Sequence, residues 1–256
     1  MNLNFNLDAV KNYHGSTQIA RVLTENWVQE NLYCPRCGNK TISHFPNNRP
    51  VADFYCPLCK NEFELKSKNG SIQRKVNDGA YETMIQRITG NQNPDFLFMS
   101  YSKEENRVRD LVLIPKHFFV PDIIEARSPL PPTARRAGWV GCNILIEKIP
   151  QQGRIDIIKN GLLIPVADVV TRVNKSDLLA VHNLSARGWL MDVLTCVNKM
   201  PSDVFYLADI YRFVPLLSSK HPQNNNVEAK IRQQLQFLRD KRYIEFLGKG
   251  VYRKLQ

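Results

Sequence analysis

Residues Val51–Lys68 read VADFYCPLCKNEFELKSK. Two short apolar segments flank a Cys-x-x-Cys pair, a pattern that predicts two adjacent antiparallel strands joined by the cysteine turn. Because side chains alternate along a strand, Glu64 and Lys66 are expected to lie on the same face. Asp53 then converges with Glu64, so the hairpin presents two carboxylates and a lysine together.

This acidic pair suits a hard divalent cation. Mg²⁺ prefers one or two carboxylates and keeps several waters, so we expect Asp53 and Glu64 to hold it, with the main-chain carbonyl of Leu65 as a further ligand. A bound Mg²⁺ polarises a phosphodiester, and Lys66 can orient the attacking water or stabilise the developing charge. Charged residues also alternate on solvated strands, but an unpaired charge beside apolar residues such as Phe63 is costly and usually functional.

Four cysteines form two pairs with metal-ligand spacing. Cys34-x2-Cys37 and Cys56-x2-Cys59 are separated by 18 residues, a spacing typical of a four-cysteine zinc site. Four thiolates leave Zn²⁺ no open coordination position, so the predicted site is structural and contributes to local folding. The metal then fixes the hairpin that carries the acidic pair. Cys142 and Cys196 lack such partners and are expected in the core.

The composition is that of an ordinary globular chain with a strong basic excess. The 256 residues are 43% hydrophobic and 23% charged, with a formal net charge of +11. Residues 184–256 hold twelve basic against six acidic side chains, which makes the C-terminal part the more concentrated basic region. A nucleic-acid partner is the main expectation from this charge, with a merely well-solvated basic protein as the alternative. No long apolar run or signal-like N-terminus is present, so we expect a cytoplasmic location without a membrane partner.

The pattern along the chain predicts two parts. Helices are expected at 16–31, at 77–90 (opened by Asn77 or Asp78 and closed by Gly90) and at 166–174. Strands are expected at 95–102, 110–119 and 153–161, and the segment 129–143, rich in proline and arginine, is expected to form an ordered loop. Together these elements indicate a mixed α/β sheet flanked by helices, with a boundary near residue 182.

The C-terminal part shows the order of a winged helix-turn-helix. A helix carrying Trp189, Val193, Leu194 and Val197 on one face precedes helices at 207–213 and 227–241, and a hairpin with a Gly-Lys-Gly turn follows at 243–255. We expect Ile231, Leu235 and Leu238 of the third helix to face inward.

Several segments carry a resemblance to a known family. Asp53, Glu64 and Lys66 stand where the PD-(D/E)xK nuclease superfamily has its motif, although Ala52 replaces the proline of the name. Over nearly its full length the chain also resembles the DpnI-type methyl-directed restriction endonucleases. The segments that carry this likeness are NNRPVADFYC, EFELKSK, NDGAY, PTARRAGWVGCNI, SARGW and KIRQQLQFLRDK.

The resemblance implies a specific fold and activity. Residues 1–182 would form a PD-(D/E)xK catalytic domain with a structural zinc site, and residues 183–256 a winged-helix domain that reads the same methylated sequence. The enzyme would be a type II restriction endonuclease, a monomer that uses Mg²⁺ to cleave both strands of DNA at GATC sites carrying N6-methyladenine. Asp53, Glu64 and Lys66 carry over as catalytic residues, and Cys34, Cys37, Cys56 and Cys59 as zinc ligands.

The expected DNA-reading residues fall in three places. Arg135 and Arg136 suit pairing with guanine, and Trp139 in the same loop matches the aromatic residue that the resemblance associates with methyl sensing, although it could equally be a core residue. The third C-terminal helix offers side chains for base edges, and the wing offers cations for phosphates. These residues are Lys230, Arg232, Gln233, Gln234 and Gln236 on the helix, and Lys249 and Arg253 on the wing.

Two other functions remain open from the sequence. A zinc-containing transcription regulator would need only the four cysteines and the winged helix, but it leaves the Glu64-Leu65-Lys66 triplet unexplained. A PD-(D/E)xK nuclease could also act on another target, such as branched or mismatched DNA. Cleavage of methylated against unmethylated DNA separates these alternatives.

Overall fold

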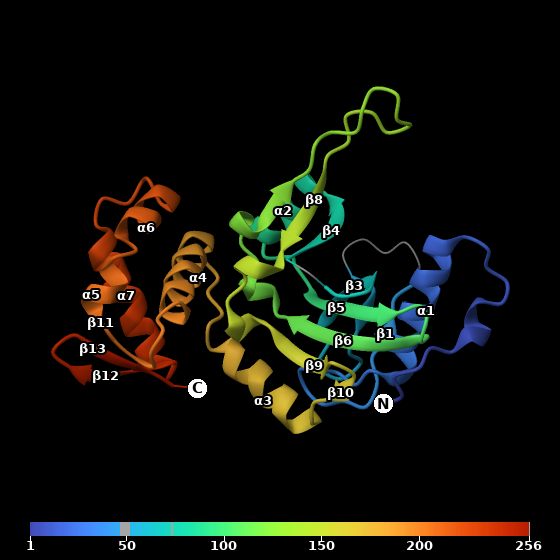
Figure 1. The fold of residues 1–256 in the computed structure, drawn as a ribbon, viewed down its shortest axis with the longest axis horizontal. Helices are drawn as coiled ribbons and strands as arrows, with labels where there is room; N and C mark the ends of the chain where they lie inside the picture. The colour runs from blue at the N-terminus through green and yellow to red at the C-terminus, as the bar shows by residue number, and fades with distance from the viewer. Residues whose placement is uncertain (47–51, 73, 256) are drawn as a thin grey trace.

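The computed structural model describes residues 1–46, 52–72 and 74–255. A seven-stranded mixed sheet forms the centre of the N-terminal part, in the order β1-β2-β3-β5-β6-β9-β10 (Figure 1). The strands are β1 (Ser43–His44), β2 (Phe54–Tyr55), β3 (Glu62–Asn69), β5 (Asp95–Ser102), β6 (Arg107–Ile114), β9 (Ile155–Lys159) and β10 (Leu162–Leu163).

One parallel pair lies at the middle of this sheet. β3 pairs parallel with β5, whereas the other neighbouring strands pair antiparallel. A parallel pair needs a crossover, and here the chain between the two strands runs through β4 (Lys75–Ala80) and α2 (Tyr81–Thr89). β4 belongs to a second sheet, in the order β4-β8-β7, with β7 (Ile124–Ala126) and β8 (Gly141–Leu145).

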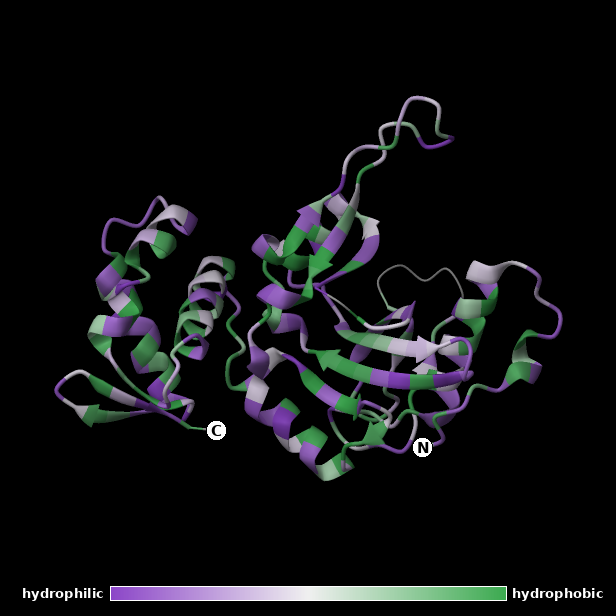
Figure 2. Ribbon diagram, viewed as in Figure 1, coloured by the Kyte–Doolittle hydropathy of each residue, from purple (hydrophilic) through white to green (hydrophobic). Residues whose placement is uncertain are grey.

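Side-chain alternation divides the core into two layers. Phe96 and Phe98 of β5 pack on the face covered by α2, while Leu97 and Met99 pack on the face covered by α1 (Ser16–Asn31) and α3 (Val166–Asp177). α3 shows hydrophobic and hydrophilic bands in Figure 2, as expected for a helix that buries one face. Among the described residues, five short 3-10 helices join these elements: η1 (Leu7–Val10), η2 (Lys116–Phe118), η3 (Pro121–Ile123), η4 (Ile146–Lys148) and η5 (Gln151–Gly153).

The C-terminal part has a helix-turn-helix order with a three-stranded sheet. Its helices are α4 (Leu184–Asn198), α5 (Leu207–Tyr211), α6 (Val214–Lys220) and α7 (Val227–Asp240), and its strands are β11 (Val204–Tyr206), β12 (Ile244–Gly248) and β13 (Val251–Lys254). The side chain of Asn183 caps α4 by accepting a hydrogen bond from the Ala186 N–H (2.9 Å). Ile231, Leu235 and Leu238 are buried, as the sequence predicts.

Several contacts join the two parts. Arg187 of α4 is buried and donates from Nη1 to the main-chain oxygen of Phe119 (3.2 Å). The Tyr243 hydroxyl donates to the main-chain oxygen of Lys175 at the end of α3 (2.6 Å). Lys220 also forms an ion pair with Asp122 (2.9 Å). The C-terminal part is therefore held against the first by polar contacts from Arg187, Lys220 and Tyr243.

The structure corrects four expectations. The helix expected at 77–90 begins only at Tyr81, because residues 75–80 pair with β8 as a strand. The strand expected at 110–119 starts earlier, at Arg107, and ends at Ile114. Strand β2 is short and Val51, where the expected strand begins, lies outside the described residues. The C-terminal part contains α6 and β11 in addition to the expected elements.

Candidate active site and metal centre

The four cysteines come together as two matching turns. The Cys34 sulfur lies 3.6 Å from that of Cys59, the Cys37 sulfur lies 3.6 Å from that of Cys56, and all four sulfurs lie within 4.8 Å of one another. Four sulfurs at a Zn–S distance of about 2.3 Å would be about 3.8 Å apart at tetrahedral corners, so the cluster has the dimensions of a zinc site.

The main chain explains why both turns have this shape. In the first turn Gly38 donates to the main-chain oxygen of Cys34 (2.8 Å), and in the second Lys60 donates to that of Cys56 (3.0 Å). Gly38 and Lys60 both have positive φ angles, 74° and 61°, which let each turn close around its sulfurs.

The electrostatics favour a thiolate at one of the four cysteines, Cys56, whereas burial raises the pKa of the Cys34 and Cys59 thiols. Burial opposes ionisation of Cys56, but the main-chain N–H groups of Cys59 and Leu58 lower the pKa of its thiol to about 7. The Cys59 N–H lies 3.5 Å from the Cys56 sulfur. Cys34 and Cys56 are buried while Cys37 and Cys59 are exposed, so a metal would enter from one side. Cys142 and Cys196 are buried elsewhere, as the sequence predicts.

The second cysteine turn joins the two strands that carry the acidic pair. β2 and β3 pair antiparallel, with Phe54 opposite Phe63. Asp53 lies just before β2, and its N–H donates to the main-chain oxygen of Phe63 (2.9 Å). The Asp53 carboxylate accepts a hydrogen bond from the Leu65 N–H (2.8 Å). Asp53 is thereby fixed beside Leu65, the residue between Glu64 and Lys66 on β3.

Leu65 presents its carbonyl to the same place. In an extended strand the N–H and C=O of one residue point toward the same edge, which is why paired residues can exchange both bonds. Since the Leu65 N–H points at Asp53, its carbonyl lies on the edge that Asp53 occupies. The Asp53 carboxylate and the Leu65 main chain therefore lie together on the side of β3 that faces β2.

Glu64 and Lys66 lie in a nearly buried ionic cluster. The Lys66 ammonium is 2.6 Å from Glu64 Oε1, and it also bonds the carboxylate of Asp78 on β4. Arg87 of α2 donates to Glu64 Oε2 (2.7 Å). The side chains of Glu64 and Asp78 are 13% and 5% exposed, so these contacts are screened little by water.

The cluster fixes the charge of the lysine. Burial alone would lower the pKa of Lys66, but the carboxylates of Glu64 and Asp78 outweigh it and raise the pKa above its usual value. Lys66 is therefore an ammonium group, which suits charge stabilisation better than proton abstraction. Asp78 and Arg87 were missed by the sequence analysis. Asp78 lies in the NDGAY segment, one of those that carry the family resemblance, and this could have identified it. Nothing in the local sequence pattern marks Arg87.

The loop between β7 and β8 carries the residues of the N-terminal part that are predicted to recognise DNA bases. This loop, residues 127–140, projects away from its sheet (Figure 1). Arg135 and Arg136 are exposed, and the Arg136 guanidinium lies over the half-buried ring of Trp139 at 4.3 Å. Trp139 is thus outside the buried core. The Leu130 N–H donates a hydrogen bond to the main-chain oxygen of Trp139 (3.0 Å), which fixes this part of the loop.

Arg127 lies at the base of this loop and was also missed. Its guanidinium is 5.6 Å from the Trp139 ring. A Cβ atom at Gly141 would overlap that guanidinium, so a side chain at this position would have to displace Arg127. Trp139 therefore lies near the arginines at 127 and 136.

The residues of α7 that are predicted to contact DNA bases differ in their exposure to solvent. Arg232, Gln233 and Gln236 of α7 are exposed, and Lys230 is half-buried. Gln234 is 7% exposed and packs inside, so its assignment as a base-reading residue is wrong. On the wing, Lys249 and Arg253 are exposed, with Arg253 3.3 Å from Glu245.

Fold and site together define a mixed α/β protein with a four-cysteine cluster and a C-terminal helix-turn-helix domain. Residues 1–182 match the family model described as the Dam-replacing family (DpnI), and residues 185–254 match the model described as the Dam-replacing HTH domain. The chain therefore belongs to the DpnI, or Dam-replacing, family. Membership implies a methyl-dependent restriction endonuclease, and the helix-turn-helix domain implies DNA binding. In the part of the chain that the structure describes, no helix is both long and apolar enough to cross a membrane.

Proposed function

We propose that this protein is a type II restriction endonuclease that uses Mg²⁺ to cleave both strands of duplex DNA at GATC sites carrying N6-methyladenine. The observation that carries the proposal is the Asp53 carboxylate bonded to the Leu65 N–H beside Glu64 and Lys66. This arrangement has the residue types and order of a PD-(D/E)xK catalytic motif. Family membership supports the methyl dependence.

The donor chemistry fits a hard divalent cation. Asp53, Glu64 and the Leu65 carbonyl offer hard oxygen ligands, and Asp78 adds a third carboxylate against the two cations Lys66 and Arg87. This local excess of negative charge favours a divalent cation. When bound, Mg²⁺ would polarise the phosphodiester and favour a hydroxide nucleophile. The four cysteines would hold Zn²⁺ as a structural ion.

The chain's own residues then have distinct roles. The Lys66 ammonium stabilises charge that develops on the phosphate oxygens, because its contacts with Glu64 and Asp78 keep it protonated. Arg87 holds Glu64 through one carboxylate oxygen, which limits its rotamers. The Leu65 N–H orients Asp53 in the same way. The strand edge thus provides a preorganised acidic pair.

Methyl recognition requires more than contact. Burying two methyl groups is worth about 1.6 kcal/mol, or roughly fifteenfold in affinity, which is too little for a strict switch. A pocket that stays imperfectly filled without the methyl groups would add discrimination. Trp139, between Arg136 and Arg127, is the residue we assign to this pocket, and Arg135 and Arg136 are assigned to guanine.

A second reading of the methylated sequence would come from the C-terminal domain. We assign residues 1–182 to catalysis and residues 183–256 to a winged helix whose α7 enters the major groove, with the protein acting as a monomer. The exposed side chains of Arg232, Gln233 and Gln236 support this orientation. Lys249 and Arg253 on the wing would contact phosphates.

Digestion of GATC-containing plasmid tests the proposal. Methylated and unmethylated plasmids are incubated with the protein, with and without added Mg²⁺, and the products are resolved on a gel. Cutting of methylated plasmid alone, and only with Mg²⁺, is the expected result. Binding without cutting would favour a transcription regulator, and equal cutting of both plasmids would indicate a nuclease with another target.

A further inference from the structure

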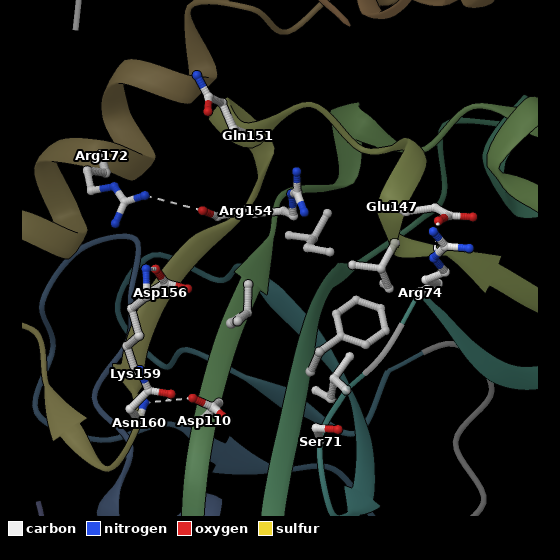
Figure 3. A pocket seen from close by; sticks show the side chains of 15 residues that line it. Ser71, Arg74, Asp110, Glu147, Gln151, Arg154, Asp156, Lys159, Asn160 and Arg172 are labelled. Atoms are coloured by element: carbon white, nitrogen blue, oxygen red, sulfur yellow. Dashed lines mark hydrogen bonds and ion pairs between the residues drawn. The ribbon is translucent and has the colours of Figure 1, made fainter. Parts of the chain in front are cut away.

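A large cavity lies on the open part of the central sheet (Figure 3). It has a volume of about 930 Å³, which is within the size range of small-molecule sites. Phe98 of β5 and Val112 and Ile114 of β6 contribute an apolar floor. Its rim is polar and includes Arg154, Lys159 and Arg172, so it combines an apolar surface with cationic side chains.

Two of its cations lack an acidic partner. Arg74 pairs with Glu147 (3.1 Å) and Lys159 pairs with Asp156 (3.3 Å) across the rim. Asp110 instead accepts hydrogen bonds from the Ser100 hydroxyl and the Asn160 N–H (both 2.7 Å).

Arg154 and Arg172 therefore remain, and neither forms an ion pair with any carboxylate of the described residues. Arg172 Nη2 donates to the main-chain oxygen of Arg154 (3.2 Å), which keeps both residues at the same side of the cavity (Figure 3). Arg154 is only half-exposed. Two guanidinium groups that line one cavity without an acidic partner favour an anionic ligand, and the planar fork of either group suits a phosphate.

The cavity also lies on the same face as the candidate catalytic lysine. Lys66 is opposite Phe98 in the β3–β5 pair, and Phe98 is opposite Val112 in the β5–β6 pair. Residues that are directly opposite on paired strands point to the same face. With about 4.8 Å between strands, the floor at Val112 lies roughly 10 Å from Lys66.

We propose that this cavity binds a nucleotide unit, with its phosphate at the part of the rim that carries Arg154 and Arg172 and its base against the apolar floor formed by Phe98, Val112 and Ile114. A nucleotide is the ligand class that combines one anionic group with a flat, largely apolar body. The choice of ligand rests on the proposed nuclease function, whereas the presence of an anion site rests on the arginine pair. The unit comes either from a free deoxynucleotide or from a DNA strand that passes beyond the catalytic lysine.

Calorimetric titration of the full-length protein without Mg²⁺ tests this inference. The probes are deoxyadenosine monophosphate and inorganic phosphate. We expect the nucleotide to bind about tenfold tighter than phosphate because it also covers the floor. The variant Arg154→Ala/Arg172→Ala should bind the nucleotide with an affinity lower by about tenfold or more. Lys11→Ala/Lys103→Ala, which removes two exposed cations elsewhere, should bind it like the unaltered protein.

Photocrosslinking with 8-azido-deoxyadenosine monophosphate gives a second measurement that needs no variant. Labelled peptides should contain residues of the cavity, including the segment 146–160. Equal affinity for nucleotide and phosphate, unchanged binding by the arginine variant, or labelling confined to other segments would each overturn the proposal. Displacement of the nucleotide by a short single strand lacking GATC would identify a DNA strand as the source, and its failure to displace would identify free nucleotides.

The plasmid digest keeps this inference separate from the proposed function. A protein that cuts methylated plasmid but binds no nucleotide would refute the cavity assignment and leave the nuclease function standing. A protein that binds the nucleotide through Arg154 and Arg172 but cuts no DNA would refute the nuclease function and leave the cavity site.

Discussion

Replacing Lys66 by alanine removes the cation that bridges two nearly buried carboxylates. Lys66 lies 2.6 Å from Glu64 and also bonds Asp78, and its side chain is 18% exposed. Loss of one partner of a buried ion pair costs about 3–5 kcal/mol. Since Arg87 still neutralises Glu64, we expect the lower end of that range. A loss of about 3 kcal/mol corresponds to a fall in Tm of about 8 °C for a protein of this size.

The same substitution should abolish catalysis for a separate reason. Removing a group that stabilises transition-state charge typically costs about 10²–10³ in rate, and the two carboxylates would also move apart. The assays are urea unfolding without added Mg²⁺, single-turnover cleavage of a methylated duplex, and binding of that duplex. Cleavage should fall by about 10³ while binding stays intact. Lys68→Ala is the matched control, because Lys68 is exposed on the same face two residues further along.

Loss of duplex binding, or unfolding equal to that of the unaltered protein, would refute the role given to Lys66.

Three further changes test other parts of the account. Trp139→Ala should erode the preference for methylated sites in a competition digest, and an unchanged preference would remove Trp139 from methyl sensing. Cys59→Ser should lower the zinc content measured by mass spectrometry and destabilise the protein, whereas Cys196→Ala should leave the zinc content unchanged. Burial lowers the pKa of His117 to about 4. The pKa of His117 in the unfolded chain is higher, so protonation at acid pH favours unfolding. The free energy of unfolding should therefore fall by about 3 kcal/mol as the pH drops from about 6.5 toward 4. His117→Gln should flatten that fall in urea unfolding, and an unaltered pH profile would argue against it.

Local patterns predicted the elements on which the candidate site rests. The helix expected at 16–31 matches α1. Its prediction depended only on the spacing of apolar residues within the helix itself. The two cysteine pairs meet because each pair closes its own turn, and the second turn lies between the strands carrying Asp53 and Glu64. These features depend on residues that are close in sequence.

Nonlocal pairing explains what sequence reasoning could not supply. Asn77 and Asp78 resemble helix caps, but their segment is held as a strand by β8, more than sixty residues further along. Asp78 therefore reaches Lys66 through tertiary structure alone. Gln234 lies three residues after Ile231, so it shares the buried side of α7 even though a polar residue suggested an exposed position.

Single-turnover cleavage by Asp53→Asn shows whether the negative charge of Asp53 is needed for catalysis. Asparagine keeps the shape of Asp53 and an oxygen that can accept from the Leu65 N–H, so the fold should be retained. It removes the charge that would hold Mg²⁺. We expect the variant to bind methylated GATC duplex and to cleave it at least about 10³ more slowly. Cleavage near the rate of the unaltered protein would contradict an active site built on Asp53, Glu64 and Lys66.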